Sequence, residues 1–135
     1  MPRAAWIANR PATASDIADL FVYGTLTNPV TLQRVLGRTH PAIGAVLMGY
    51  RRHEGKYPYL VRASGRALRG WVLRKLGRAE FECLDHYEVT TPQRHHGAMS
   101  RLYCRELVKV VMTGGVSVHC WVYMPFLDDW PASWR

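Results

Sequence analysis

The stretch Phe21-Val22-Tyr23-Gly24-Thr25-Leu26 marks the place where a buried strand gives way to a loop and then to a helix. Residues 20–23 are apolar or aromatic, as in a buried strand. Gly24 interrupts the run, and Asn28-Pro29 follows, with Asn suited to cap a helix and Pro to its first position. A strand that ends in a glycine-containing loop leaves backbone N–H groups free to face a ligand. A purely structural turn has the same pattern, so both interpretations stay open at this point.

Patterning along the chain predicts mainly strands with two short helices, which is typical of an α+β fold with a curved or barrel-like sheet. Helices are expected over residues 29–36, ending at Gly37, and over residues 79–87. Strands are expected over residues 20–23, 41–50, 59–62, 68–76, 103–112 and 116–124, with hairpin turns at residues 64–66 and 113–115. The remaining segments, residues 51–58, 89–102 and 125–135, are expected to form turns, a loop and an irregular surface tail.

Length and composition predict one globular domain. The chain has 135 residues, 48% of them hydrophobic, which is enough for a real core. We expect residues 19–135 to form this domain and residues 1–18 to be a flexible N-terminal extension. No window approaches the roughly 18 consecutive apolar residues of a membrane span, and the N-terminus has no apolar core of signal-peptide length. The sequence therefore predicts a cytoplasmic protein without a membrane partner.

The charge is strongly basic, with a formal net charge of +8 and a pI of about 9.9. Such a surface attracts anions, including nucleic acid. The Arg and Lys residues are scattered, however, and no predicted helix carries a dense basic stripe. This pattern favours a solvated basic surface over a specific nucleic-acid site.

Cysteine and histidine spacing predicts neither a disulfide framework nor a metal site. The three cysteines cannot all pair within one chain, and their apolar neighbours are typical of reduced thiols used as small core residues. The six histidines show no spacing typical of zinc ligands.

Several motifs, taken in order, resemble the gamma-glutamylcyclotransferase-like family. Tyr23-Gly24-Thr25-Leu26 is similar to the family's Tyr-Gly-(Thr/Ser)-Leu loop, and Leu84-Asp85-His86-Tyr87-Glu88 to its Leu-Asp-x-(Tyr/Phe)-Glu element. Tyr103-Cys104-Arg105 is similar to its Tyr-x-Arg strand start. Between these, Tyr57-Pro58 and residues 69–72 fit its Tyr-Pro and Gly-x-Val positions. The resemblance covers roughly residues 20–124, and its order and spacing are more specific than any single motif.

The resemblance implies a small mixed β-barrel flanked by short helices. It also implies an enzyme that needs no metal or other cofactor and acts on a small-molecule γ-glutamyl amine or peptide. In the family, the free α-amine of the γ-glutamyl group attacks its own γ-carbonyl, which gives 5-oxoproline and a free amine. Carried over to this sequence, the general acid/base is Glu88. The loop Gly24, Thr25 and Leu26 is expected to bind the substrate through its backbone N–H groups.

Glu88 also has properties that follow from its position alone. It falls at the end of a predicted helix, where negative charge is disfavoured, and Tyr87 and Val89 flank it. Desolvation by such neighbours would raise its pKa and suit it to proton transfer near neutral pH. The alternative is an ordinary solvated glutamate.

Four tyrosines are the other candidate binding residues that the resemblance implies: Tyr23, Tyr57, Tyr103 and Tyr123. Each has an alternative role in packing, since strand tyrosines fit a half-buried pleat. Arg105 shares a face with Tyr103 and is expected either to pair with Asp85 or Glu88 or to attract a carboxylate. Asp85 is expected to be architectural.

Two features depart from the family pattern. Val89 follows the glutamate where many relatives have Gly or another small polar residue. A longer, basic segment then runs to Tyr103, and a loop at this place is expected to overhang the pocket and to affect substrate choice.

Two other functions remain compatible with the same residues. One is a γ-glutamyl amide hydrolase, with water as the acceptor. The other is a non-catalytic module that binds a small molecule or a protein. The sequence identifies neither the amine that is released nor the oligomeric state.

Overall fold

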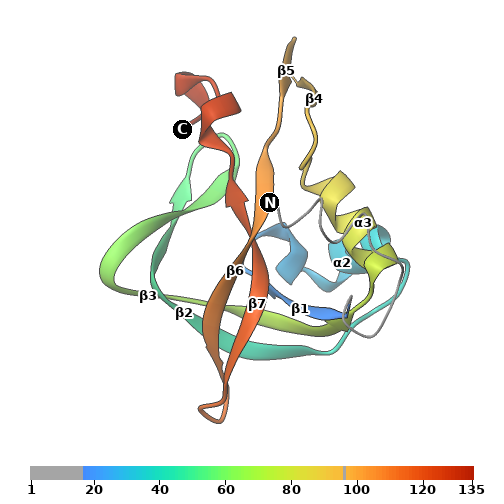
Figure 1. Ribbon diagram of the computed structural model, residues 1–135, viewed down its shortest axis with the longest axis vertical. Helices are drawn as coiled ribbons and strands as arrows, with labels where there is room; N and C mark the ends of the chain where they lie inside the picture. The colour runs from blue at the N-terminus through green and yellow to red at the C-terminus, as the bar shows by residue number, and fades with distance from the viewer. Residues whose placement is uncertain (1–16, 96) are drawn as a thin grey trace.

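The computed structural model describes residues 17–95 and 97–135 as a closed five-stranded barrel with two helices on one side (Figure 1). Its strands follow the order β1 (Ala18–Val22), β3 (Pro58–Leu76), β2 (Ala42–Glu54), β6 (Tyr103–Met112) and β7 (Ser117–Pro125). Strand β1 pairs in parallel with β7 and closes the barrel, whereas the other pairs are antiparallel. The predicted class, a small mixed α+β barrel flanked by short helices, is confirmed.

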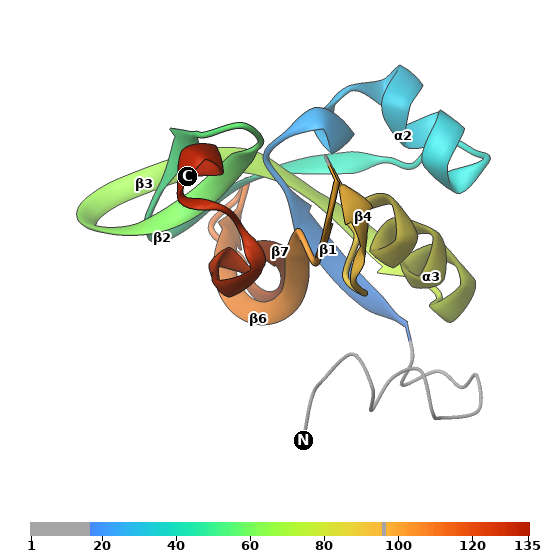
Figure 2. The ribbon, with the colours of Figure 1, turned by 90° about the horizontal axis from the view of Figure 1, so that it is seen from above.

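The two helices are α2 (Pro29–Leu36) and α3 (Arg78–Tyr87), and they lie on the same side of the barrel (Figure 2). Helix α2 has the predicted bounds. The Asn28 side chain caps it by accepting a hydrogen bond from the Val30 amide at 2.9 Å, and Gly37 ends it with a left-handed φ of 80°. Neither helix in the described part of the chain has the length and apolar character of a membrane span.

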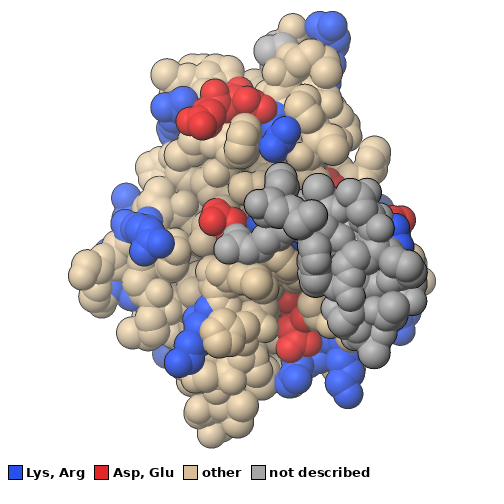
Figure 3. Space-filling model, in the orientation of Figure 1, with Lys and Arg blue, Asp and Glu red and all other residues tan. Residues whose placement is uncertain are grey.

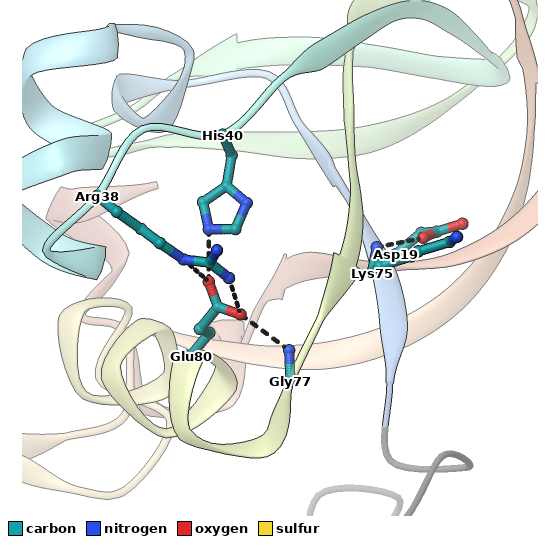
Figure 4. A network of polar contacts seen from close by, with 6 residues as sticks. All are labelled: Asp19, Arg38, His40, Lys75, Gly77 and Glu80. Atoms are coloured by element: carbon teal, nitrogen blue, oxygen red, sulfur yellow. Dashed lines mark hydrogen bonds and ion pairs between the residues drawn. The ribbon is translucent and has the colours of Figure 1, made fainter.

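A polar network fixes the start of α3 (Figure 4). Glu80 accepts hydrogen bonds from the Gly77 amide at 3.0 Å and from Arg38 at 2.9 Å, and it also contacts His40. Burial alone would raise the pKa of Glu80, but the Gly77 amide, Arg38 and His40 together lower it. The network thus joins the segment after α2 to the first turn of α3.

Strands β2 and β3 are longer than their patterns indicate, and two predictions were wrong here. The expected turn over residues 51–58 is largely strand, because β2 continues to Glu54. The expected hairpin at residues 64–66 does not form, since β3 runs without interruption from Pro58 to Leu76. Both halves of β3 pair with β2, and residues 63–66 bulge opposite Gly49, where the register shifts. Long-range pairing with one partner therefore overrides a local sequence that favours a turn.

The segments after α3 and β7 also differ from expectation. Residues 89–102 contain a short hairpin, β4 (Gln93–His95) and β5 (Ala98–Ser100), which projects beyond the barrel end (Figure 1). The tail forms two 3-10 turns, η3 (Leu127–Asp129) and η4 (Ala132–Trp134). It does not simply lie on the surface, because Trp130 and Trp134 are buried in the core. The predicted extension over residues 1–18 lies almost wholly outside the described residues.

Buried hydrophobic residues form two clusters, one inside the barrel and one outside it, against the helices. Alternation along β1 sends Phe21 into the barrel interior with Val72 and Val110, and Leu20 to the outer cluster beneath α3. Cys120 belongs to the interior and fits the prediction of a small core thiol, whereas Cys83 is exposed and does not. Basic side chains are spread over the visible face without forming one patch (Figure 3).

Gly70 permits the close approach of β1 and β3 next to the loop Tyr23-Gly24-Thr25-Leu26, which we call the signature loop. A Cβ at this position would lie 2.4 Å from the Val22 carbonyl oxygen and 2.5 Å from the Phe21 ring. We expect Gly70→Ala to lower the free energy of unfolding by about 1–3 kcal/mol, as overpacked cores do. Arg69→Ala, an exposed neighbour on the same strand, is the control and should change it by less than about 0.5 kcal/mol. Equal midpoints for both variants in urea denaturation would contradict this view of the contact.

Candidate active site

A cavity of about 310 Å³ opens at the end of the barrel, where β1 and α3 both terminate. It is lined by the eight residues predicted for catalysis or substrate binding: Tyr23, Gly24, Thr25, Leu26, Tyr57, Glu88, Tyr103 and Tyr123. Six further residues complete the lining, namely Phe21, Val22, Pro58, Tyr87, Val89 and Leu102. Of these, Tyr87 had a detectable signal, since it directly precedes Glu88 in the quoted motif. Pro58 also had a signal in the Tyr57-Pro58 motif, Phe21 and Val22 belong to the predicted strand before the loop, and Val89 and Leu102 are the ends of the predicted loop 89–102.

The loop after β1, Gly24 to Leu26, lines this cavity and contains backbone amides without a hydrogen-bond acceptor among the described residues. Residues Thr25–Thr27 form a 3-10 turn, η2, with Gly24 as its N-cap. The turn satisfies the amides of Thr27 and Asn28, which donate to the Gly24 and Thr25 carbonyls. The amides of Gly24, Thr25 and Leu26 lie outside the strands and α-helices, and they have no hydrogen-bond acceptor among the described residues. Such first-turn N–H groups suit an anion or a developing oxyanion.

Three of the four predicted tyrosines already donate to protein acceptors. The Tyr23 hydroxyl donates to the Tyr123 carbonyl at 3.0 Å, and the Tyr103 hydroxyl donates to the Pro58 carbonyl at 2.6 Å. The Tyr123 hydroxyl donates to Asp85 at 2.7 Å. Burial raises the pKa of all three phenols above the ordinary value, so they stay protonated. Their rings and fixed hydroxyls therefore shape the cavity, and none is available as a base.

Tyr57 is placed by the C-terminal tail. Its ring makes edge contacts with Trp130 and Trp134, each at a centroid distance of 6.1 Å. The tail is held in turn at the β2–β3 connection, where the Lys56 amide donates to the Trp134 carbonyl at 2.8 Å. Two tryptophans that the sequence assigned to the surface thus support one wall of the cavity.

Asp85 and Arg105 form a buried ion pair beside the cavity. The Arg105 Nε lies 2.9 Å from Asp85 Oδ1, and its Nη2 donates to Oδ2 at 3.0 Å. The guanidinium is sandwiched between the rings of Phe81 and Trp121. Burial raises the pKa of Asp85, but Arg105 and the Tyr123 hydroxyl oppose this shift by favouring the carboxylate. Of the roles expected for Arg105, the structure shows the ion pair with Asp85.

Glu88 caps the C-terminal end of α3, with its amide donating to the Leu84 carbonyl at 2.8 Å. In the described part of the chain, its carboxylate has no hydrogen-bond or ion-pair partner. Burial, with a smaller effect of the nearby Asp85 charge, raises its pKa from 4.5 to about 8. A carboxyl group with a pKa near neutrality in a cavity is suited to accept and return a proton.

Val89 shows why a glycine would fit the position after the glutamate. Its φ is 54°, in the left-handed region that a β-branched residue seldom adopts. Two hydrogen bonds hold it there, from the Val89 amide to the His86 carbonyl at 3.2 Å and from the Leu102 amide to the Val89 carbonyl at 2.9 Å. Among the described residues of the basic segment 89–102, its two ends, Val89 and Leu102, line the cavity. That this segment overhangs the pocket stays a prediction.

Within the described ranges, no three His, Cys, Asp or Glu side chains converge as metal ligands would. The cavity's own polar groups are a carboxylic acid, phenols, one threonine hydroxyl and backbone amides. This set can bind and protonate an organic ligand without assigning any residue to a metal.

The raised pKa of Glu88 predicts a pH-dependent effect on stability. Between pH 4.5 and about 8 the folded protein retains the Glu88 proton while the unfolded chain releases it, so stability falls as the pH rises. Glu88→Gln removes this effect. The difference in free energy of unfolding, variant minus parent, should therefore rise with pH through that range. Its slope should be at most about 1.4 kcal/mol per pH unit. Glu82→Gln, on the exposed side of α3, is the control. Parallel curves of unfolding free energy against pH for the parent and Glu88→Gln would refute the raised pKa of Glu88.

The family model for "Gamma-glutamyl cyclotransferase, AIG2-like" matches residues 20–132 of this chain. Protein AIG2 C of Arabidopsis thaliana is 32% identical over 95 residues, which cover 68% of this chain and 58% of that protein. AIG2-like protein C of the same plant is 34% identical over 98 residues, with coverage of 70% and 51%. The chain thus spans little more than half the length of the curated relatives that it matches.

Solved structures agree with the fold. A solution structure of an Arabidopsis thaliana protein is 25% identical, with a TM-score of 0.70, and the match covers 94% of this chain and 72% of that one. A structure described as gamma-glutamyl cyclotransferase is 15% identical with a TM-score of 0.66, covers 81% and 66%, and shares the fold. With a family match across most of its length, the chain belongs to the AIG2-like gamma-glutamyl cyclotransferase family.

Proposed function

We propose that this protein converts a small γ-glutamyl amine or γ-glutamyl peptide into 5-oxoproline and the free amine. The observation that carries the proposal is Glu88, a carboxyl group that has no partner among the described residues and lines a small cavity together with the loop residues Gly24, Thr25 and Leu26. Family membership supports a cyclotransferase-type enzyme in general, and the residues below account for the individual steps.

The nucleophile in this reaction belongs to the substrate. The α-amine nitrogen forms a bond to the γ-carbonyl carbon, and the bond from that carbon to the departing nitrogen breaks. No water is consumed and no protein nucleophile is needed. The enzyme must hold the glutamyl group in its ring-closing shape, and such proximity effects lower barriers by several kcal/mol. A cavity of about 310 Å³ lies at the small end of ligand pockets and suits this compact conformation.

Glu88 moves the proton. The substrate arrives with an α-ammonium group, whose positive charge favours the Glu88 carboxylate and offsets the desolvation that keeps the empty site protonated. Glu88 takes a proton from this ammonium, so that the amine can attack, and gives it to the departing nitrogen. After ring closure the attacking nitrogen still carries two hydrogens and loses one more proton, and the departing amine leaves as an ammonium ion. One group can serve both directions because its pKa of about 8 in the empty site is near neutrality.

The loop amides bind negative charge. No Arg or Lys lines the cavity among the described residues, so the backbone N–H groups of Gly24, Thr25 and Leu26 are the donors that face an anionic substrate group there. They serve either the α-carboxylate or the oxyanion that forms at the γ-carbonyl. One preorganised donor to an oxyanion contributes about 10²-fold or more in rate.

Mass spectrometry of 5-oxoproline tests the activity. The protein and Glu88→Gln are incubated with γ-glutamyl amino acids, γ-glutamyl alkylamines and ε-(γ-glutamyl)-lysine. We expect 5-oxoproline from the parent and a rate about 10²–10⁴-fold lower from Glu88→Gln, which keeps the shape of the side chain but cannot accept the proton. Free glutamate instead of 5-oxoproline would indicate a hydrolase. Ligand binding without turnover in either protein would indicate a binding module.

The pH dependence of kcat/KM tests the role of Glu88 separately. Because the free enzyme must lose the Glu88 proton to bind and activate the substrate, kcat/KM should fall about tenfold per pH unit below pH 8. In the complex the substrate ammonium favours the carboxylate, so the corresponding limb of kcat should lie at lower pH. Superimposable limbs for kcat and kcat/KM would show that Glu88 is not the titrating group.

A further inference from the structure

The rim of the cavity is closed by a contact between two side-chain hydroxyls. Thr25 Oγ1 and Tyr87 Oη lie 2.8 Å apart, which is a normal hydrogen-bond distance. Thr25 comes from the signature loop and Tyr87 from the last turn of α3, so the contact joins the two elements that bear the free amides and Glu88. Of the described residues that line the cavity, only Thr25 and Tyr87 are exposed. The exposed side of the cavity is therefore the side that this bridge spans.

Tyr87 also borders a second depression. A groove between α2 and α3 is lined by Val35, Ala79, Glu82, Cys83, His86 and Tyr87. Tyr87 is the one described residue that lines both this groove and the cavity. Tyr87, 36% exposed, thus lies at the border between them, and its hydroxyl is within hydrogen-bond distance of the Thr25 hydroxyl across the rim.

We infer that Tyr87 determines specificity by limiting the size of the leaving amine. This inference rests on the proposed function. The γ-glutamyl group must lie within reach of Glu88 and the loop amides, which leaves the amine at the exposed rim beside Tyr87. A long amine meets the Tyr87 ring and cannot continue into the α2–α3 groove, so the intact protein prefers short amines.

Binding is the direct test, because it does not require turnover. Affinities of the γ-glutamyl amides of methylamine, propylamine, pentylamine and heptylamine are measured by calorimetry in a Glu88→Gln background, which is expected to cyclise them about 10²–10⁴-fold more slowly than the parent. With Tyr87 present, affinity should stop rising or fall as the chain lengthens. With Tyr87→Ala, the longer chains enter the groove, and each newly buried methylene should tighten binding by up to about fourfold.

Two control variants isolate the effect of the Tyr87 ring from its surroundings. Tyr87→Phe keeps the ring but removes the hydroxyl, so it should retain the preference for short chains. Cys83→Ala enlarges the groove on the same helix without touching the cavity wall, and it should leave the length dependence unchanged. Tyr87→Leu, which fills more space than Ala, serves if Tyr87→Ala fails to fold, and it should relax the preference partly.

The outcomes separate this inference from the proposed function. Identical length dependence with and without the Tyr87 ring would overturn the inference, even if the parent protein releases 5-oxoproline. A relaxed length dependence would support it. If the parent then produced no 5-oxoproline, Tyr87 would still define the size of the ligand, and only the proposed reaction would fail.

Discussion

The ion pair between Asp85 and Arg105 is the interaction on which the site depends. It joins α3 to β6 through contacts of 2.9 and 3.0 Å, and the guanidinium is packed between an aromatic ring of α3 and one of β7. A buried charge is costly unless it is paired, so removing either partner would leave the other uncompensated. The pair therefore fixes how the last turn of α3 meets the barrel, and that turn carries both Tyr87 and Glu88.

Glu88 does not share the cation of this pair. Of the described Arg and Lys residues, only Arg105 contacts Asp85: its Nη2 donates to Oδ2, its Nε lies 2.9 Å from Oδ1 without forming a hydrogen bond, and its buried Nη1 has no hydrogen-bond partner there. Glu88, three residues beyond Asp85, has no ion-pair partner among the described residues and lies near the Asp85 charge. Both conditions favour its protonated form in the empty cavity. A ligand with an ammonium group would supply the missing charge, in line with the proposed γ-glutamyl substrate.

Local rules predicted the parts of the fold that are decided locally. Asn28-Pro29 and Gly37 gave the bounds of α2, and Gly114-Gly115 gave the β6–β7 turn, where both glycines have positive φ. The missed features depend on distant partners. Residues around Gly65 have the composition of a turn, but β2 pairs with β3 on both sides of them. Trp130 looks like a tail residue, but its indole N–H donates to the Leu102 carbonyl at 2.9 Å and its ring joins the core.

The site followed the same division. The motifs predicted eight residues, and all eight line one cavity, because the end of β1 and the end of α3 are each marked by local signals. Tyr87 was named only as a motif residue and neighbour of Glu88, since nothing in the sequence shows that its hydroxyl meets Thr25, 62 positions earlier. Its role at the rim follows from three-dimensional contacts alone.

The proposed role of Glu88 depends on a carboxyl group that is protonated near neutral pH when the cavity is empty. Carbon-13 NMR of protein labelled at the glutamate side-chain carboxyl carbon measures this directly, with the Glu88 signal assigned from its loss in Glu88→Gln. We predict a titration midpoint near 8, far above the other glutamates. A midpoint near the ordinary value of 4.5 would contradict the account, because Glu88 would then be a solvated carboxylate without the desolvation that suits it to proton transfer.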